Sequence, residues 1–211
     1  FWDEAYIVHH LTDEIIETPV LLNESKKYGT ENRVFMFTST SKITFPGAGV
    51  SAIACSESSM KYICKRFSVM IISYDKMNQL RHVRFLKNKD GVLQHMAKHR
   101  RRLVPCFDAV KTAFKEELTP CGDIAHWTNP KGGYFISLYV MPGCAKRVAQ
   151  LCKDCGLTLT GAGAAFPYGI DPQDSHLRIA PTYPSLSEVE TASMLLTVCV
   201  RLAVVEKLLA E

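Results

Sequence analysis

Arg33-Val34-Phe35-Met36-Phe37-Thr38-Ser39-Thr40-Ser41-Lys42 is the stretch that decides the fold of this 211-residue chain. Its first six residues are mostly aromatic or β-branched, which predicts a strand over residues 33–38. Its last four residues are polar and lead into the turn sequence Pro46-Gly47-Ala48-Gly49. Polar side chains just beyond a strand of an α/β sheet are typical of a binding or catalytic site. The stretch therefore predicts such a sheet, with a site beside Lys42.

Two other polar groups stand at comparable places. Asp3-Glu4-Ala5-Tyr6 lies where a strand is expected to end, and Arg178 lies between Leu177 and Ile179 in an apolar strand. Each is a weak signal alone, because a strand-end aspartate usually caps the next turn and a strand arginine usually serves an ion pair. Their order along the chain, together with Lys42, singles them out.

Hydrophobic patterning outlines the rest of the first half. Residues 50–55 predict a second short strand, and residues 57–66 predict a short helix. Residues 74–89 are polar and basic and show no clear period.

A long helix is predicted over residues 91–118, and Pro105 is expected to kink or split it. A bend in a long helix is a natural domain junction. We therefore expect one domain over residues 1–100 and a second over residues 101–211.

The second half alternates between strands and helices. Strands are predicted over residues 133–140, 157–160 and 176–180, and a helix over residues 145–155. Ser185 and Glu188 form a capping box at the start of a last helix, whose apolar positions continue at helical spacing to Leu209. This half predicts a compact α+β domain.

Composition excludes several classes of protein. Apolar residues make up 47% and charged residues 22%, and the formal net charge is +4, so disordered, collagen-like and disulfide-scaffold chains are excluded. The charge excess is too small to indicate nucleic acid, and the basic run Lys98–Arg102 is better explained as a solvated helix face. The longest uncharged stretch, residues 155–170, contains four Gly and is too short for a membrane span.

The cysteines predict a reducing, cytoplasmic environment. Eight are spread along the chain, mostly among apolar residues, as expected of reduced core thiols. Cys152 and Cys155 form the one motif-like pair, but no second pair completes a zinc site. His9 and His10 point to opposite sides of either a strand or a helix, so we expect no metal.

In this order, Asp3-x-x-Tyr6, Ser39-x-Ser41-Lys42 and the strand residue Arg178 resemble the pyridoxal 5'-phosphate (PLP) aminotransferases of fold type I, class I/II. The segment Asn129-Pro-Lys-Gly-Gly-Tyr-Phe-Ile-Ser137 is similar to the small-domain Pro-x-Gly-Gly-x-Phe segment of that family. The runs Asn78–Phe85 and Phe166–Pro172 resemble a bacterial-type aspartate aminotransferase subgroup.

This resemblance implies a fold, a cofactor and an activity. The fold is α/β, PLP-transferase fold type I, consisting of the C-terminal part of the large αβα domain and the smaller α+β C-terminal domain. The implied activity is a PLP-dependent transaminase that moves an amino group from an amino acid, with aspartate the expected donor, to a 2-oxo acid. A homodimer that binds neither nucleic acid nor membrane is the implied active form.

The resemblance also assigns roles to residues. Lys42 is the implied catalytic lysine, which bonds to the cofactor aldehyde and then moves the substrate proton. Cofactor binding is implied for Asp3 at the ring nitrogen, Tyr6 at the phenolic oxygen, and Ser39 and Ser41 at the phosphate. Substrate binding is implied for Arg178 at the α-carboxylate and for Asn129 and Gly133, with Gly132, at the wall facing the substrate.

The sequence departs from the family pattern in two respects. In many relatives an arginine that grips the phosphate follows the lysine closely, whereas residues 46–50 contain none. Backbone amides of this glycine-rich turn are one substitute. The opening Phe1-Trp2 reads as the end of a strand, with no targeting segment, and we expect the chain to match only the second half of the family pattern.

Arg81 and Arg84 are candidates for a receptor of the substrate's side-chain carboxylate, and surface helix charges are an equally good explanation.

Three alternatives stay open. A lyase or decarboxylase of fold type I would share Asp3, Tyr6 and Lys42. A PLP-binding sensor domain of a transcriptional regulator would retain Lys42 and Arg178 as well. An inactive structural remnant is disfavoured, because the recognisable chemistry of this half is intact.

Overall fold

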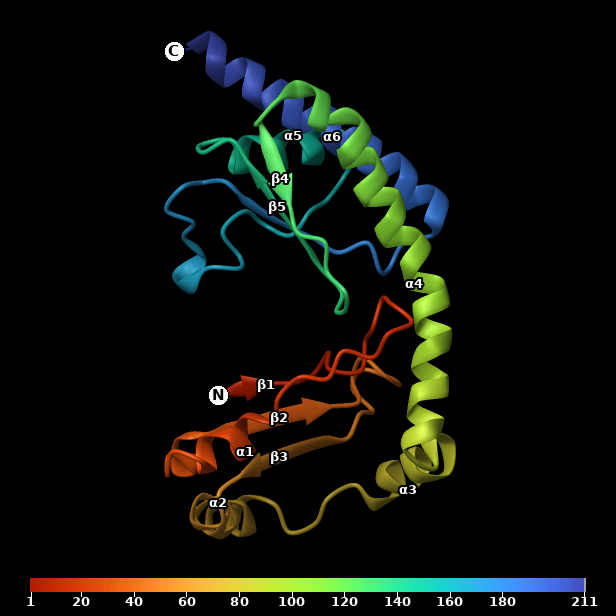
Figure 1. The fold of residues 1–211 in the computed structure, drawn as a ribbon, viewed down its shortest axis with the longest axis vertical. Coiled ribbons are helices and arrows are strands. Elements are labelled where there is room, and N and C mark those ends of the chain that lie inside the picture. Colours follow the sequence, from red (N-terminus) through yellow and green to blue (C-terminus); the bar gives the residue numbers. More distant parts are fainter. Residues whose placement is uncertain (211) are drawn as a thin grey trace. The chain divides into compact units, whose positions relative to one another are not determined.

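A computed structural model describes residues 1–210, and the chain divides into two compact units, residues 1–99 and residues 100–211 (Figure 1). Each unit has its own three-stranded sheet.

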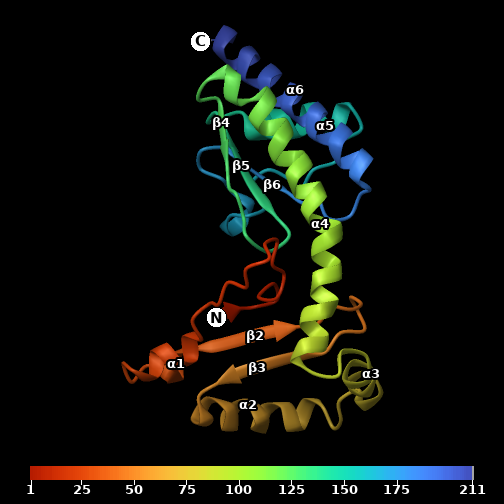
Figure 2. The same ribbon diagram turned by 45° about the vertical axis from the view of Figure 1, so that its right-hand side comes forward.

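The sheet of the first unit contains β1 (Trp2–Asp3), β2 (Phe35–Ser39) and β3 (Ser51–Cys55), in that order across the sheet. β1 runs parallel to β2, with Asp3 opposite Phe37, and β3 runs antiparallel to β2 (Figure 2). The strands expected over residues 33–38 and 50–55 are confirmed. β2 begins two residues later than expected because Glu31–Arg33 form a 3-10 turn in front of it.

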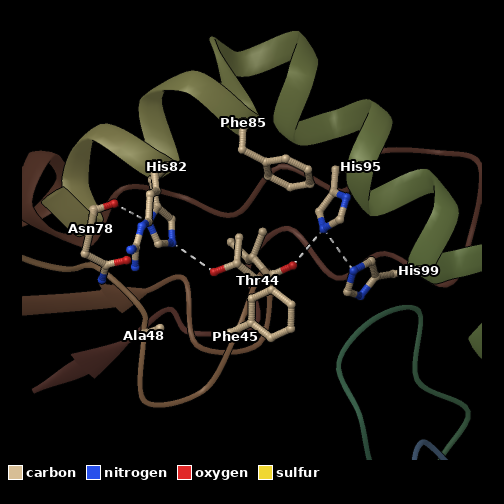
Figure 3. A pocket seen from close by; sticks show the side chains of 10 residues that line it. Thr44, Phe45, Ala48, Asn78, His82, Phe85, His95 and His99 are labelled. Carbon is tan, nitrogen blue, oxygen red and sulfur yellow. Dashed lines mark hydrogen bonds between the residues drawn. The ribbon is translucent and has the colours of Figure 1, made fainter.

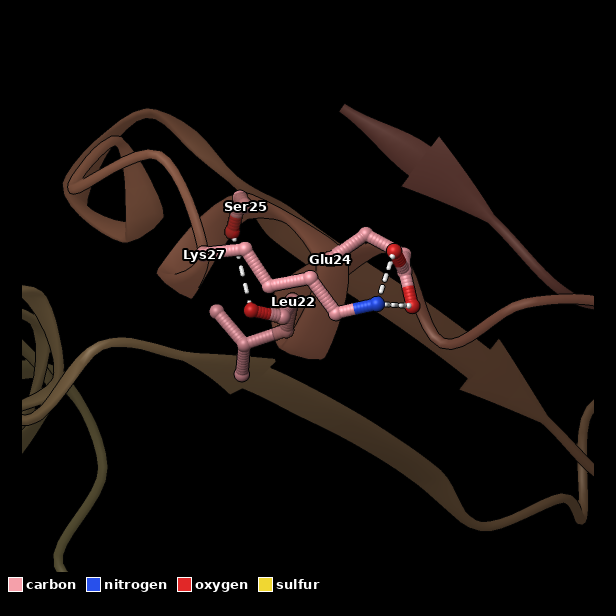
Figure 4. Close-up of polar contacts among 4 residues, drawn as sticks. All are labelled: Leu22, Glu24, Ser25 and Lys27. Atoms are coloured by element: carbon pink, nitrogen blue, oxygen red, sulfur yellow. Dashed lines mark hydrogen bonds and ion pairs between the residues drawn. The ribbon is translucent and has the colours of Figure 1, made fainter.

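A short helix, α1 (Leu21–Lys26), precedes β2. Ser25 Oγ donates to the Leu22 carbonyl at 2.9 Å, and Lys27 Nζ lies 2.6 Å from Glu24 Oε2 (Figure 4). These contacts one turn apart hold a helix that is too short to be stable alone.

Two longer helices follow β3. α2 (Glu57–Met70) extends beyond the expected residues 57–66 (Figure 2). Its N-cap is Ser56, whose side chain accepts from the Ser59 amide. α3 (Lys76–Leu86) lies in the stretch for which no period was recognised. Asp75 begins α3 by accepting from the Asn78 amide at 2.9 Å.

Pro105 does not split the long helix. α4 runs as one helix from Lys89 to Glu117 with Pro105 inside it, so the expectation of a split helix is wrong. A proline there removes one backbone hydrogen bond, but the neighbouring apolar residues Phe107, Val110 and Phe114 are almost completely buried. Burial of this face outweighs the local cost.

The second unit has an antiparallel sheet of β4 (Ala125–Trp127), β5 (Ile136–Val140) and β6 (His176–Ile179), with β5 in the centre. Alternate residues of β5 are buried, and α5 (Ala145–Asp154) packs against α6 (Leu186–Ala210) (Figure 1). The short 3-10 helices Thr119–Cys121 and Pro167–Gly169 complete the unit.

One expected strand of this unit is absent. Residues 157–160 form no regular structure, because the Leu157 amide donates to the Cys152 carbonyl at 2.8 Å and thereby closes the end of α5. The capping box of α6 is confirmed: the Ser185 amide donates to Glu188 Oε2 at 2.7 Å, and the Glu188 amide donates to Ser185 Oγ at 3.4 Å. No helix between residues 1 and 210 has the length and apolar composition needed to cross a membrane.

Candidate functional site

The ends of β1 and β2 place polar side chains at one edge of the first unit's sheet. The two strands are parallel, and the Glu4 amide donates to the Phe37 carbonyl at 2.7 Å just beyond β1. The chain after Asp3 and the chain after Ser39 therefore leave the sheet in the same direction. This is the edge at which α/β sheets bind ligands.

Asp3 caps the turn that follows β1. Its Oδ1 accepts from the Ala5 amide at 2.9 Å. Capping uses one carboxylate oxygen as an acceptor and leaves the negative charge of the group in place, so the cap and a ligand-binding role are compatible.

Tyr6 is connected to Lys42 through His9. The Tyr6 and His9 rings meet edge to face with centroids 5.5 Å apart, and His9 Nε2 lies 3.1 Å from the carbonyl oxygen of Lys42. His9 is only 3% exposed. Burial lowers the pKa of its imidazole, so the ring is neutral at pH 7.

Lys42 lies on a tight turn after β2. The Ile43 and Thr44 amides both donate to the Thr40 carbonyl, at 2.9 and 2.8 Å. Lys42 is exposed, whereas Ile43 beside it is buried. The turn thus directs the lysine outward and anchors itself through the next residue.

Ser39 and Ser41 lie on the same turn. The Ser41 amide donates to Ser39 Oγ at 3.5 Å. Gly49 packs closely behind, because a Cβ at that position would lie 3.0 Å from Ser41 Oγ and 3.2 Å from its nitrogen. A larger residue at position 49 would require the Ser41 turn to shift.

A pocket of about 520 Å³ lies beside this turn, and it is lined by a set of histidines that the sequence did not single out (Figure 3). In the figure, His82 and His95 flank Thr44. His82 Nε2 lies 2.9 Å from both Thr40 Oγ1 and Thr44 Oγ1, and His95 Nε2 lies 2.8 Å from the Ile43 carbonyl. In the sequence, these histidines were indicated only by the spacing of His95 and His99, which lie one helical turn apart.

The carboxylate-receptor candidates lie on α3 and differ in position. Both are exposed, but Arg81 lines the pocket together with His82 and Arg84 does not. Of the two, Arg81 is the one that the structure places beside the Lys42 turn.

The remaining candidates lie in the second unit. Arg178 stands opposite Ser137 in the sheet, its guanidinium carbon lies 4.6 Å from the centre of the Phe135 ring, and it lines a cavity of about 160 Å³. Its Nε is buried without a hydrogen-bond partner among residues 1–210. A buried donor without a partner costs free energy unless a ligand supplies an acceptor.

Asn129 and Gly133 are less tightly held. Asn129 Oδ1 accepts from Lys111 Nζ at 3.3 Å, and Gly133 has a φ of +84°, which favours glycine there. Each unit therefore gathers its own set of candidates: Asp3, Tyr6, Ser39, Ser41 and Lys42 in the first, and Asn129, Gly133 and Arg178 in the second.

The Cys152–Cys155 pair shows no sign of chemistry. Cys152 is fully buried, and burial raises the pKa of its thiol to about 12, so it stays protonated. Within the described part of the chain, no group of three or more His, Cys, Asp or Glu residues could hold a metal ion.

Known proteins resemble this chain over its whole length. The family model for aspartate amino-transferase matches residues 1–211. A relative from Mycolicibacterium smegmatis is 47% identical over 210 residues, which are 100% of this chain and 49% of that protein. An aspartate aminotransferase from Corynebacterium glutamicum is 43% identical over 205 residues, covering 97% of this chain and 47% of that protein. The chain thus spans about half the length of the curated relatives it matches.

Solved structures are similar as well. A crystal structure of an aspartate transaminase from Corynebacterium glutamicum superposes with a TM-score of 0.95 at 43% identity, covering 98% of this chain and 48% of that one. LysN, an α-aminoadipate aminotransferase from Thermus thermophilus complexed with N-(5'-phosphopyridoxyl)-L-leucine, has a TM-score of 0.78 at 18% identity, covering 96% and 50%. At that low identity, the second match concerns the fold alone.

Proposed function

The chain belongs to the aspartate aminotransferase family, and on that premise we propose that the protein is a PLP-dependent transaminase that moves an amino group from aspartate to a 2-oxo acid. The observation that carries this proposal is the edge of the first sheet. There the chain beyond two parallel strands presents a carboxylate, a phenol, two serine hydroxyls and a primary amine.

This set of donors fits PLP. The cofactor, when bound, supplies a ring that withdraws electrons from the substrate α-carbon. The Asp3 carboxylate would hold a proton on the ring nitrogen, and the Tyr6 hydroxyl would donate to the phenolic oxygen. Ser39 and Ser41 would donate their hydroxyls to the phosphate. Lys42 would hold the cofactor at its aldehyde group through Nζ and, as a free amine, would move the substrate proton.

Arg178 binds the substrate's α-carboxylate in this proposal. Its buried and unpartnered Nε supports the role, because a carboxylate can accept from Nε and a terminal nitrogen of a guanidinium at the same time. Asn129 and Gly133 form the wall that faces the substrate, and Arg81 is the candidate for the aspartate side chain.

The proposal includes an oligomeric state and a location. We propose a homodimer, which the exposed apolar side chains of the first unit support. A cytoplasmic location is supported by eight cysteines that are all free thiols.

The alternatives have no observation in their favour. The named proteins compared above are aminotransferases or transaminases. None of them is described as a regulator, a lyase or a decarboxylase.

The test is chemical mapping combined with an activity assay. PLP-loaded protein is reduced with borohydride and digested, and we expect the pyridoxyl group on Lys42. Oxaloacetate formation from aspartate and 2-oxoglutarate is followed in a coupled assay. A label on any other lysine would remove Lys42 from its role, and a label on Lys42 without transamination would favour a lyase.

A further inference from the structure

Two consecutive carbonyls of the Lys42 turn face imidazole rings. The Lys42 carbonyl oxygen lies 3.1 Å from His9 Nε2, and the Ile43 carbonyl oxygen lies 2.8 Å from His95 Nε2. His9 comes from the loop after β1, and His95 comes from α4. Two separate segments of the first unit therefore hold the backbone of one turn.

The positions of the protons follow from the partners. A carbonyl oxygen only accepts, so His9 and His95 must each carry hydrogen on Nε2. His99 Nε2 lies 3.1 Å from His95 Nε2. Since His95 Nε2 already carries its hydrogen, His99 Nε2 must be the unprotonated nitrogen of that pair. Burial and the neighbouring His95 lower the pKa of His99, which is consistent with a neutral ring.

The position of the turn governs the position of the amine. A lysine has four methylene groups and reaches many places when its backbone is free. With both carbonyls held and Ser41 packed against Gly49, the Cα of Lys42 is fixed from two sides. Fixing the Cα restricts the region that Nζ can sample. In catalysis, a displacement of about 1 Å in a reacting group can cost on the order of 100-fold in rate.

We propose that His9 and His95 are positioning residues that hold the Lys42 amine in its working place by donating Nε2–H to the carbonyls of Lys42 and Ile43. The inference rests on the proposed function of Lys42. The Ile43 carbonyl sets the tautomer of His95, which in turn sets that of His99, and the ring of Phe85 supports His95 edge to face at 5.1 Å.

The first test needs no substitution. Nitrogen-15 NMR of the wild-type protein at pH 7.5 reports which ring nitrogen of each histidine carries hydrogen. We expect hydrogen on Nε2 of His9 and His95, and on Nδ1 of His99. An Nε2 without hydrogen on either His9 or His95 would overturn the proposal.

The second test compares His95→Leu with His95→Gln, because the glutamine amide retains a donor near the position of Nε2 and leucine does not. In the PLP-loaded protein, we expect His95→Leu to keep the borohydride label on Lys42 while kcat falls about 10- to 100-fold with KM little changed. The pH midpoint of the cofactor absorbance should shift, and His95→Gln should restore both quantities most of the way. His126→Phe, which keeps a ring beside Tyr139 in the second unit, is the control.

The outcomes separate the two proposals. A wild-type protein without a label on Lys42 overturns the proposed function and this inference with it. A labelled wild type, together with a folded His95→Leu variant of unchanged kcat and unchanged absorbance midpoint, overturns the inference alone. If His95→Leu does not fold, the His95→Gln variant decides. Turnover and midpoint near those of the wild type support a positioning donor, and a fall in kcat of about 10-fold or more in His95→Gln contradicts it.

Discussion

At the scale of single residues, Arg178 and Asp3 each have a structural contact and a proposed functional role, and the two can be tested separately. Arg178 is a strand residue stacked on Phe135, yet its Nε is buried with no partner among the described residues. Asp3 is a strand-end cap, yet its carboxylate lies at the edge where the Lys42 turn begins. Each residue allows a substitution that removes one property and keeps the other.

Arg178→Lys should weaken amino-acid binding and leave PLP bound. Lysine keeps the charge but loses the two-nitrogen fork, and a hydrogen bond to a charged group contributes about 1.5–3 kcal/mol. Titrating the cofactor absorbance with aspartate should show a dissociation constant raised about 10- to 100-fold. Arg147→Lys, at an exposed arginine paired with Glu206, is the control. An unchanged affinity would make Arg178 a structural residue only.

Asp3→Asn should retain PLP and lose most turnover. Asparagine can still accept from the Ala5 amide, so the cap survives, but a neutral side chain no longer holds the ring nitrogen protonated. Single-turnover measurements should show a loss on the order of 100-fold, with thermal stability close to that of the wild type. Asp75→Asn, at the cap of α3, is the matched control. Near-normal rates in Asp3→Asn would limit Asp3 to its capping role.

At the scale of elements, the sequence predicted what depends on local patterns and missed what depends on contacts. The strand before Lys42 and the capping box of α6 were predictable, because β-branched residues and a Ser–Glu spacing act locally. α3 was missed because its apolar residues Met77, Leu80 and Val83 are exposed in a helix dense with polar residues. The uninterrupted path of α4 through Pro105 could not be read from the sequence, because it depends on tertiary burial.

The residues of the candidate site also fall into two groups, those that a local motif identified and those that only the folded structure brings together. Lys42, Asp3 and Arg178 were identified by motif, and their roles stay predictions. His82 and His95 were not identified, and His9 was considered only as a metal ligand, because the three lie on different segments that only the fold brings together. A helical spacing such as that of His95 and His99 indicates a shared face but not what that face meets.

The same histidines predict an acid-sensitive element. Burial lowers the pKa of His9 and of His99 below the ordinary value of 6.5. At His9, hydrogen bonds to the backbone of Lys42 and Tyr6 partly oppose this lowering of the pKa, and the charges of His10 and Lys42 add to it. At His99, the neighbouring His95 and His9 add to it. Below about pH 6.5, these histidines therefore take up protons in the unfolded chain but not in the folded chain. The free energy of unfolding consequently decreases as the pH is lowered, until the pH is below the pKa values of the folded state. Urea unfolding between pH 7.5 and 5.5 should show this loss.

His99→Gln should reduce that slope, since it removes one of the two titrating groups. His126→Gln, in the second unit, should keep the wild-type slope. Equal slopes in all three proteins would show that His99 does not contribute. The range stops at pH 5.5 because carboxyl groups begin to titrate below it.

At the scale of the whole molecule, the expected α/β fold of type I is confirmed by relatives and solved structures that extend over almost all of the chain. The chain covers about half of each, and large apolar side chains stand exposed in its first unit. At and just beyond the end of α2 these are Val69, Met70, Ile72 and Tyr74. A cluster of exposed apolar side chains is typical of a surface that contacts another protein or another part of the same protein.

We therefore expect the purified 211-residue chain to self-associate. Light scattering coupled to gel filtration should give a mass that rises with concentration. The double variant Val69→Ser/Met70→Ser should lower it, because the two residues are 86% and 74% exposed. Leu209→Ser, at an equally exposed leucine near the end of α6, is the control. A monodisperse monomer at all concentrations would contradict the expectation.

The loop that carries Lys42 is closed at its two ends by a pair of hydrogen bonds between Thr40 and Val50. The Thr40 amide donates to the Val50 carbonyl, and the Val50 amide donates to Thr40 Oγ1, each at 2.8 Å. Between these two points, Phe45, Gly47 and Ala48 are exposed. In evolutionary terms, this pair of hydrogen bonds allows the exposed part of the loop to vary in sequence and length while the two ends of the loop keep their positions. Descendants of such a chain could therefore exchange what surrounds the lysine and acquire new substrates without relocating the amine itself.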